Sequence, residues 1–459
     1  MIENIKKVGL VSLGCPKNRV DSEIILGDMR RSGFEITPRE SEAHIIIVNT
    51  CGFIDAAREE SVDTILQMAE FKKKGCCETL VVTGCLSQKY REELLEQIPE
   101  IDFLFGTTNL GIISRILLRK GPSSVPEKKM WVDDPDLPPE SGEGRVATTP
   151  GHSAYVKISE GCSSRCTFCI IPRLRGKYRS RPMESILREV NILAENAVKE
   201  INIVSQDTTL YGVDLGMKNG LSRLLGKIEK IRGIRWIRLL YCHPSLVDKE
   251  LIRVVASSEK VCKYMDLPIQ HSHDDMLMDM GRNETERTIR DLVEELRTNV
   301  PGIVLRTEII VGFPGEKSMH FEHLSNFIRE MKFDRVGVFS YSLERDTPSA
   351  GLSPRVKSAT KERRVEEILK IQKKISYALN QRLVGTVQDV LVDGYGSRDN
   401  SEEAPLPLWE GRLAAQAPEI DGVVYLDQTG PGEIQPGEVR RVKLMEAGDY
   451  DFVGRILKK

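Results

Sequence analysis

Three cysteines lie close together on one predicted loop: Cys162, Cys166 and Cys169, in C-x3-C-x2-C spacing. They follow the apolar run Tyr155–Ile158, which predicts a short buried strand. Thiolates held this tightly can reach one metal centre, and they are the usual ligands of iron–sulfur clusters. On a four-iron cluster, three thiolates leave one iron without a protein ligand. The spacing therefore predicts a cluster at the end of a strand, with an open iron for a small molecule.

A structural zinc ion is the alternative for these three thiolates. Such a site is closed by a fourth protein ligand. His152 is the only histidine nearby, and it is poorly placed because it lies before the strand rather than after it. The sequence therefore favours a cluster over zinc.

A second set of cysteines is spread over the first hundred residues. Cys15, Cys51 and Cys85 each follow a short apolar run, and their separations of 36 and 34 residues match one strand–helix–strand period. In an open parallel sheet, the carboxyl ends of neighbouring strands meet at one edge, where ligands bind. The pattern predicts a second cluster; the alternative is coincidence, because buried cysteine is a common small apolar residue. The three runs are Val8–Leu13, Ile45–Val48 and Leu80–Val82.

The remaining cysteines form no such group, and we interpret Cys76, Cys77, Cys242 and Cys262 as structural. Ten cysteines are too few for a disulfide scaffold in a chain of 459 residues, and grouped cysteines are typical of metal sites in a reducing compartment. The first apolar run is shorter than the core of an export signal. No run approaches the ~20 apolar residues that span a bilayer. We therefore expect a cytoplasmic protein.

Strand and helix patterns alternate through most of the chain, which predicts an α/β fold with parallel sheets. We expect an N-terminal open parallel domain over residues 1–120, a linker rich in proline, serine and glycine over 121–152, and a partial (β/α) barrel with a trailing helix over 153–382. Short runs separated by glycine turns then predict a small antiparallel β-barrel over 383–459. The predicted central strands are Tyr155–Ile158, Ile201–Val204, Trp236–Tyr241, Tyr264–Pro268, Val304–Val311 and Val336–Tyr341, and the helices Met183–Ala197, Leu221–Ile231, Glu284–Val300, His320–Met331 and Lys357–Leu383.

The run of three cysteines resembles the signature of the radical S-adenosylmethionine superfamily, in which an aromatic residue, here Phe168, precedes the last cysteine. Its place after the first strand of a six-unit barrel matches as well. The resemblance implies that the open iron binds the amino and carboxylate groups of S-adenosylmethionine. It also implies cleavage to a 5′-deoxyadenosyl radical, which takes hydrogen from an unactivated C–H bond. In such enzymes the cofactor carries the difficult chemistry and the protein positions it.

Two cysteine trios in this order, followed by a small β-barrel, resemble the methylthiotransferase family from end to end. Members join an N-terminal cluster domain, a radical barrel and a C-terminal TRAM domain, an OB-like antiparallel barrel. The resemblance implies two 4Fe-4S clusters and replacement of C–H by C–S–CH3, with one S-adenosylmethionine as methyl donor and another as radical source. The cluster on Cys15, Cys51 and Cys85 is implied in sulfur delivery. A reductant and a sulfur donor are implied as partners.

Three stretches look like the branch of this family that modifies the β-carbon of one aspartate in ribosomal protein S12. They begin at Ser12, Ser205 and Leu267 and read SLGCPKNRVDSE, SQDTTLYG and LPIQHSH. The tRNA-modifying branch typically carries Gln-Met-Asn where this chain has Pro16-Lys17-Asn18, and Gly-Gln-Asn where it has Ser205-Gln206-Asp207. These differences favour a ribosomal-protein substrate over tRNA.

The distribution of charge favours the same substrate. The chain has 66 basic and 68 acidic residues, so no overall polycation marks a nucleic-acid partner. From Ser376 to Lys459 there are 9 basic and 14 acidic residues. A barrel that grips an RNA backbone is expected to be basic, whereas an acidic one suits a basic ribosomal protein. The alternative is that these charges only solvate the domain.

Other functions compete with this prediction. A tRNA adenosine methylthiotransferase is the main alternative. A radical methylase or oxidoreductase with a single cluster is another, and a non-catalytic RNA-binding protein with a zinc or cluster scaffold comes from a different class. Iron content separates them, because two four-iron clusters predict about eight irons per chain.

Polar residues at the ends of the central strands are further candidates, because parallel barrels place their chemistry there. Gln206 and Asp207 follow the second strand and Arg306 lies in the fifth. We expect these three to bind the cofactor together with Phe168. Gly312 joins them, since glycine permits close backbone approach to the adenosine, although a simple turn also explains the nearby Pro314-Gly315.

The histidines and arginines near these strands carry weaker predictions. Gln270 and His271 follow the fourth strand, and we interpret His271 and His273 as structural or substrate-facing rather than as metal ligands. Residues that act as general acid or base are not identified by the sequence. Four arginines after the cysteine loop either steady carboxylates or form a solvated basic loop; they are Arg173, Arg175, Arg179 and Arg181.

Overall fold

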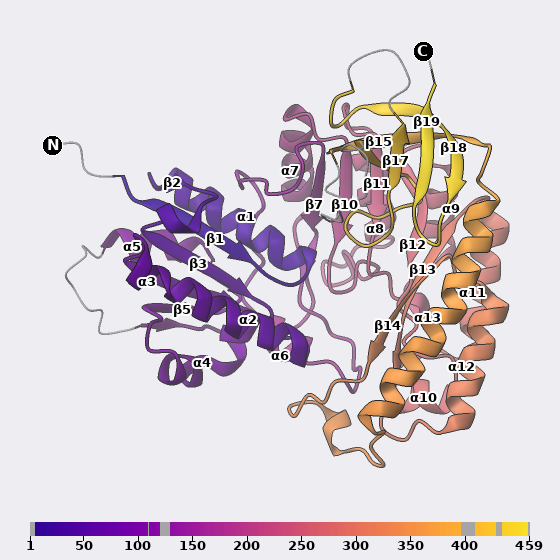
Figure 1. Ribbon diagram of the computed structural model, residues 1–459, viewed down its shortest axis with the longest axis horizontal. Coiled ribbons are helices and arrows are strands. Elements are labelled where there is room, and N and C mark those ends of the chain that lie inside the picture. Colours follow the sequence, from indigo (N-terminus) through magenta and orange to yellow (C-terminus); the bar gives the residue numbers. More distant parts are fainter. Residues whose placement is uncertain (1–4, 109, 120–128, 396–408, 428–433, 458–459) are drawn as a thin grey trace, which may run out of the picture.

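A computed structural model describes residues 5–108, 110–119, 129–395, 409–427 and 434–457. Figure 1 shows an N-terminal sheet with helices, a central set of parallel strands with helices along one side, and a small barrel next to the C-terminus. The predicted α/β class with a C-terminal β-barrel is confirmed. Within the described ranges, no helix is long and apolar enough to cross a membrane.

The N-terminal part is a six-stranded parallel sheet in the order β2-β1-β3-β4-β5-β6. Its central strand β3 is buried at every position, as expected for an apolar run covered by helices on both faces. The strands are β1 (Lys7–Ser12), β2 (Glu35–Ile36), β3 (Ile45–Thr50), β4 (Thr79–Gly84), β5 (Phe103–Phe105) and β6 (Met130–Trp131), and the helices α1 (Pro16–Arg31), α2 (Asp55–Ala69), α3 (Phe71–Lys74), α4 (Cys85–Gln97) and α5 (Ile113–Arg119).

The segment that we expected to be a linker contributes to this packing. β6 adds a strand to the edge of the N-terminal sheet. Farther along, Arg145 is buried between Glu23 of α1, at 3.1 Å, and Glu189 of the central part, at 3.3 Å. Residues 129–152 are therefore bound to both neighbouring parts, and the domain boundaries stay a prediction.

The central part is a six-stranded parallel sheet in the order β14-β13-β12-β11-β10-β7, with β7 and β14 as its two ends. Consecutive strands along the chain are neighbours, so the sheet is the predicted partial barrel. Its strands are β7 (Ser153–Lys157), β10 (Glu200–Val204), β11 (Trp236–Leu239), β12 (Val261–Asp266), β13 (Val304–Val311) and β14 (Arg335–Ser340), with the short pair β8 (Ser159–Glu160) and β9 (Arg179–Ser180) beside them.

Helices cover one face of this sheet through a large apolar core. Figure 1 shows α11, α12 and α13 along that outer side. The helices are α6 (Ile171–Arg175), α7 (Met183–Glu195), α8 (Gly220–Ile228), α9 (Lys249–Ser257), α10 (Asp274–Asp279), α11 (Glu286–Asn299), α12 (Ser318–Met331) and α13 (Ser358–Gln381). The five predicted helices match α7, α8, α11, α12 and α13, and α6, α9 and α10 are additional.

The opposite face of the sheet is filled by the other two parts of the molecule. Tyr155 and Tyr264 of the central strands form one buried apolar cluster with Ile24 of α1 and Leu391 of the C-terminal barrel. An incomplete barrel has an open inner face, and these partners remove its apolar side chains from water. Helix α1, which begins directly after Cys15, is thereby fixed against the central sheet.

The C-terminal part is a closed five-stranded barrel in the order β15-β16-β17-β19-β18. A separate apolar core fills it, built around Val390, Trp409 and Phe452. Its strands are β15 (Val387–Tyr395), β16 (Trp409–Leu413), β17 (Val424–Asp427), β18 (Val439–Ala447) and β19 (Phe452–Ile456). β16 is the strand that the sequence pattern did not predict.

Buried ion pairs join this barrel to the central sheet. Glu200 of β10 pairs with Arg412 of β16 at 2.8 Å and with Arg238 of β11 at 3.0 Å. All three side chains are buried. Burial acts to raise the pKa of Glu200, but the two guanidinium groups outweigh it and lower that pKa to about 2. The carboxylate is therefore a charged link between two parts of the fold.

This link predicts a pH-dependent stability. The pKa of Glu200 is about 2 in the folded chain and 4.5 in its unperturbed state, so its contribution of about 3 kcal/mol is complete above pH 4.5 and is lost as the pH falls toward 2. We expect Glu200→Gln to be less stable than wild type at pH 7, with the difference shrinking at pH 3.5. Denaturant unfolding at both pH values measures this, with the exposed Glu59→Gln as control. A difference that stays constant with pH would contradict it.

Candidate active site

The N-terminal cysteines meet at one edge of the first sheet. Cys15 lies just before α1, Cys51 directly follows β3, and Cys85 is the first residue of α4 after β4. Because β1, β3 and β4 are neighbouring parallel strands, their carboxyl ends point to the same edge. Gly14 has a φ of +83°, and a Cβ atom there would lie 2.8 Å from the Cys51 sulfur. The close approach of these two strand ends therefore requires glycine.

The second trio lies on the loop after the first central strand, as predicted. The loop is fixed to the end of α10, since the Thr167 N–H donates to the Met280 carbonyl at 2.9 Å. Arg282 places its Nη1 3.8 Å from the Cys166 sulfur. Phe168 packs against the apolar cluster that contains Phe313. These contacts hold the loop at the carboxyl ends of the central strands.

The chemistry of both trios suits a positively charged metal group. Burial raises the pKa of Cys85 to about 11 and that of Cys169 to about 12. In each case part of this rise comes from the other two thiols of the trio, which lie close enough to repel one another as thiolates. A bound metal cluster would relieve that repulsion, because metal ligation needs the deprotonated thiol.

The spacing of the sulfurs argues against a single zinc ion. Sulfurs at 2.3 Å from one zinc would be separated by about 3.8 Å. In the described residues, neither trio has all three sulfur atoms within 4.8 Å of one another. In the described residues, neither trio therefore forms a ready-made site for a single ion.

The two trios face each other across the boundary between the first two parts of the molecule. Cys85 forms a small buried cluster with Ile170, which directly follows Cys169, and with Leu174 of α6. The guanidinium Nε of Arg175 donates to the Cys85 sulfur at 3.3 Å. A cluster on either trio would thus be next to the other.

A buried network of charges surrounds this contact. Arg175 donates to Asp21 at 2.6 Å and to Asn18 at 2.9 Å, both on α1. Lys157 of β7 pairs with Asp21 and, at 2.5 Å, with Glu160. All these side chains are buried. Because the members come from both parts, the network fixes the first trio relative to the second.

Models of known families match all three parts of the chain. Residues 7–106 match uncharacterized protein family UPF0004, residues 156–328 the radical SAM superfamily, and residues 384–457 the TRAM domain. Among curated proteins, the chain is 45% identical to ribosomal protein uS12 methylthiotransferase RimO of Geobacter sulfurreducens, over 98% of this chain and 99% of that protein. It is 44% identical to the protein of the same name from Acetivibrio thermocellus, over 99% of both chains.

The chain belongs to the RimO family of methylthiotransferases. The membership in this family that we inferred from the two cysteine trios is confirmed. Solved structures agree on the fold: the radical S-adenosylmethionine methyltransferase TsrM from Kitasatospora setae superposes with a TM-score of 0.55 at 14% identity, covering 87% of this chain and 82% of that one.

In this methylthiotransferase, two predicted cofactor residues near the second trio each have a buried polar atom without a hydrogen-bond partner. Gln206 donates to Glu160 at 2.8 Å, and its carbonyl oxygen is buried without a hydrogen-bond partner. Asp207 uses one carboxylate oxygen on the Thr209 N–H at 3.1 Å, while the other is buried and unpaired. Asp207 also raises the pKa of Cys162 by its charge, so it faces the cysteine loop. Such orphaned atoms are typical of a ligand site.

Two other predicted cofactor residues have partners within the protein. Arg306 donates to Asp266 and to Glu308, each at 2.7 Å, so its charge is balanced inside the sheet. Gly312 has a φ of +73°, and a Cβ atom there would lie 2.3 Å from the Lys361 side chain of α13. The packing of α13 is thus a sufficient reason for glycine at this position. Their roles toward a cofactor stay a prediction.

The four arginines after the cysteine loop mostly contact carboxylates. Arg181 pairs with Glu189 at 2.7 Å and is buried, as is Arg175, whereas Arg179 reaches Asp136 at 3.2 Å. Only Arg173 is well exposed.

The sequence did not reveal the carboxylates of the buried network, Asp21 and Glu160. A signal was present in α1, where Asn18 and Asp21 lie three residues apart on one helix face close to Cys15.

Proposed function

We propose that this chain is a radical S-adenosylmethionine enzyme that attaches a methylthio group to the β-carbon of an aspartate in ribosomal protein S12. The observation that carries this proposal is the juxtaposition of two cysteine trios, in which Cys85 packs against Ile170 beside Cys169. A methylthio transfer needs a hydrogen-abstracting centre and a sulfur-bearing centre near one substrate carbon. Two adjacent three-thiolate sites meet that need.

The proposed cluster ligands are Cys162, Cys166 and Cys169 for one 4Fe-4S cluster and Cys15, Cys51 and Cys85 for the other. When bound, the first cluster and S-adenosylmethionine supply hydrogen abstraction, and the second supplies a place for sulfur. The chain holds the thiolates and presents the free oxygens of Gln206 and Asp207 toward the first site. Phe168, Arg306 and Gly312 are proposed to complete the S-adenosylmethionine site.

Three observations support S12 rather than tRNA as the substrate. The curated relatives that match over nearly their full length are named uS12 methylthiotransferases. Residues Pro16–Asn18 and Ser205–Asp207 have the S12-branch sequence. The segment from Ser376 to Lys459 has five more acidic than basic residues, which is complementary to a basic ribosomal protein.

The reaction needs electrons and sulfur that the chain does not contain. We therefore include a reductant for the clusters and a sulfur donor among its partners. We also propose a cytoplasmic location, because ribosomal protein S12 would be met there, either free or in the small subunit.

An assay with two substrates tests the choice of target. Anaerobically reconstituted enzyme is incubated with S-adenosylmethionine, a reductant, sulfide and either S12 or unmodified tRNA. The proposal predicts that mass spectrometry finds a methylthio group on one S12 aspartate. Modification of tRNA alone would overturn the choice of substrate.

Arg175 offers a test of the ligand role of Cys85. Its N–H and its positive charge stabilise the reduced, more negative state of a cluster bound at that sulfur. We expect Arg175→Ala to lower the reduction potential of the second cluster by about 60 mV, the one-electron equivalent of about 1.4 kcal/mol. A redox titration followed by electron paramagnetic resonance measures the shift. Arg173→Ala, at an exposed position of the same short helix, is the control; an unchanged potential in Arg175→Ala would contradict the assignment.

A further inference from the structure

Four of the seven histidines of the chain gather at one place outside the cysteine sites. His271 and His273 belong to the segment after β12, and His320 and His323 lie in the first two turns of α12. The rings of His273 and His320 have centroids 4.5 Å apart, and those of His273 and His323 are 5.1 Å apart. Chain segments nearly fifty residues apart in sequence thus bring their imidazoles together.

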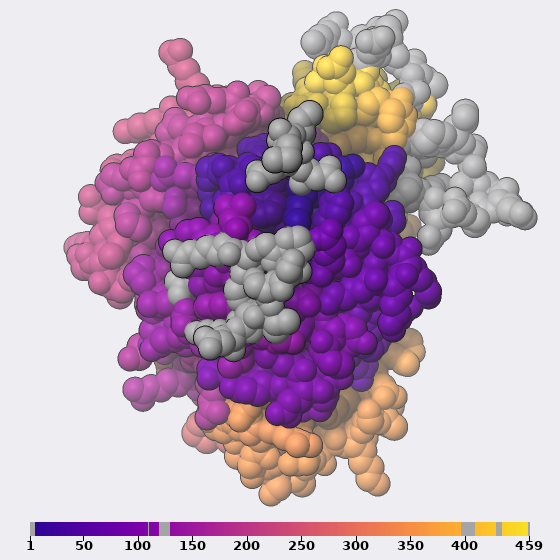
Figure 2. Space-filling model, turned by 90° about the vertical axis from the view of Figure 1, so that its left-hand side faces the viewer, coloured from indigo at the N-terminus to yellow at the C-terminus, as the bar shows by residue number. Residues whose placement is uncertain are grey.

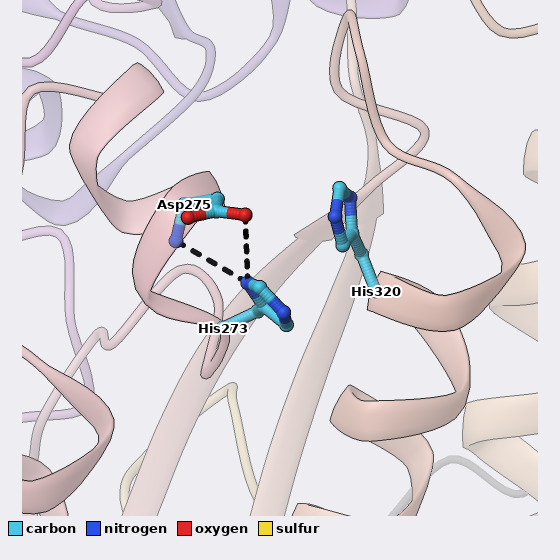
Figure 3. Close-up of side chains that lie close together, drawn as sticks. All are labelled: His273, Asp275 and His320. Carbon is cyan, nitrogen blue, oxygen red and sulfur yellow. Dashed lines mark hydrogen bonds and ion pairs between the residues drawn. The ribbon is translucent and has the colours of Figure 1, made fainter.

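Three side chains of this group converge on one space. Figure 3 shows His273 and Asp275, from the start of α10, opposite His320 from the start of α12. One ligand atom of each lies within 4.8 Å of the other two. His273 Nδ1 is 3.9 Å from Asp275 Oδ2. His320 is buried while Asp275 is exposed. The space between them therefore has one wall inside the protein and is accessible to an ion from solvent on the side of Asp275.

The other two histidines of the group lie outside the converging set. His323 contacts Ser272 at 3.1 Å and Glu286 at 3.0 Å through its two ring nitrogens. His271 is buried, with its Nδ1 accepting from the His273 N–H at 3.0 Å and its Nε2 3.6 Å from Glu316. These contacts hold the backbone around His273 and form one side of the space between the three side chains. The side chains that converge on that space are those of His273, Asp275 and His320.

We propose that His273, Asp275 and His320 bind a divalent transition-metal ion, with Zn2+ as the best fit. Two imidazoles and one carboxylate are ligands that zinc takes, and water completes the four-coordinate site. This site changes our interpretation of His273, which we expected not to be a metal ligand.

Metal binding through the Nδ1 atoms would break two existing hydrogen bonds. Nδ1 of His273 accepts from the Asp275 N–H and Nδ1 of His320 from the Lys317 N–H, each at 3.2 Å. An ion that uses these lone pairs replaces two long hydrogen bonds. We therefore expect weaker binding than at a closed site of four protein ligands.

The bound ion would join two segments at the carboxyl ends of neighbouring strands. It would connect the start of α10, just after Gln270 and His271, to the start of α12, just after Gly312. The same end of the sheet carries the cysteine loop, which is tied to the end of α10 at Met280. The ion would thus stiffen the wall beside the proposed S-adenosylmethionine site. The metal site does not depend on the proposed function, and either can fail alone.

Zinc uptake by the cluster-loaded protein tests the site. Anaerobically reconstituted enzyme, with its iron content measured, is dialysed against Zn2+ and analysed for both metals. We expect one zinc per chain in wild type with no loss of iron, and at least a tenfold weaker affinity in His320→Ala and in Asp275→Ala. His44→Ala is the control, because His44 also accepts a backbone N–H through Nδ1 but belongs to no such group.

Thermal unfolding gives a second readout that does not require a count of metal. Zinc should raise the melting temperature of wild type and of His44→Ala, and should leave that of His273→Gln unchanged. Failure of wild type to take up zinc, uptake that displaces iron, or equal uptake by wild type and the folded His320→Ala variant would each overturn the proposal.

Discussion

Replacing Cys162, Cys166 and Cys169 together with alanine is expected to abolish the reductive cleavage of S-adenosylmethionine. The rate of 5′-deoxyadenosine formation should fall by more than about 1,000-fold, because the cofactor supplies the difficult chemistry and these thiolates are its proposed protein ligands. Iron should fall from about eight to about four per chain. Chromatography of the nucleoside product and iron analysis of the same sample measure both effects.

The fold should survive this triple substitution. The three side chains are only partly buried in a loop whose backbone is fixed by Thr167 and Met280, and they take no part in the large apolar core. Cys262→Ala, at a buried cysteine of β12 away from both trios, is a demanding control that should keep cleavage and iron content. Cleavage that persists in the triple variant would contradict the assignment of the first cluster.

Replacing Cys15, Cys51 and Cys85 with alanine should separate cleavage from sulfur transfer. We expect S-adenosylmethionine cleavage to stay within about threefold of wild type, while methylthio product falls by more than about 100-fold. Cys162, Cys166 and Cys169 follow a strand of a different sheet and retain their own loop contacts, so they can still hold their cluster. Iron should again fall to about four per chain.

Two measurements on one sample check this separation: deoxyadenosine by chromatography and modified S12 peptide by mass spectrometry. Cys76→Ala is the matched control, since Cys76 is an exposed cysteine of the same part of the chain. Product formation at the wild-type rate in the triple variant would show that Cys15, Cys51 and Cys85 do not form the sulfur-bearing site.

Much of this site could be predicted because each cysteine follows an apolar strand. Runs such as Ile45–Val48 and Tyr155–Ile158 are short, continuous and apolar, a pattern that indicates buried parallel strands. Parallel strands bring their carboxyl ends together, so residues 36 and 34 apart in sequence become neighbours. The predicted strands all overlap observed ones. Of those missed, β2 and β6 have two residues each and too little pattern to detect, whereas in the five residues of β16 the polar Glu410 and Arg412 interrupt the apolar run.

The contacts between the parts of the molecule could not be predicted in the same way. From their local sequences, Asp21 of α1 and Arg175 of α6 are expected to be ordinary surface charges. They are buried together only because α1 packs against the central sheet. His273 and His320 belong to different strand–helix units and meet only through the tertiary fold. Local periodicity carries no information on such pairings.

The most direct test of the central claim is mass spectrometry of ribosomal protein S12 and of tRNA nucleosides from cells that lack this gene. We predict that the methylthio group disappears from one S12 aspartate, that tRNA modification is unchanged, and that the wild-type gene restores the group while a Cys162→Ala variant does not. Loss of the methylthio group from tRNA with S12 unaffected would contradict the account.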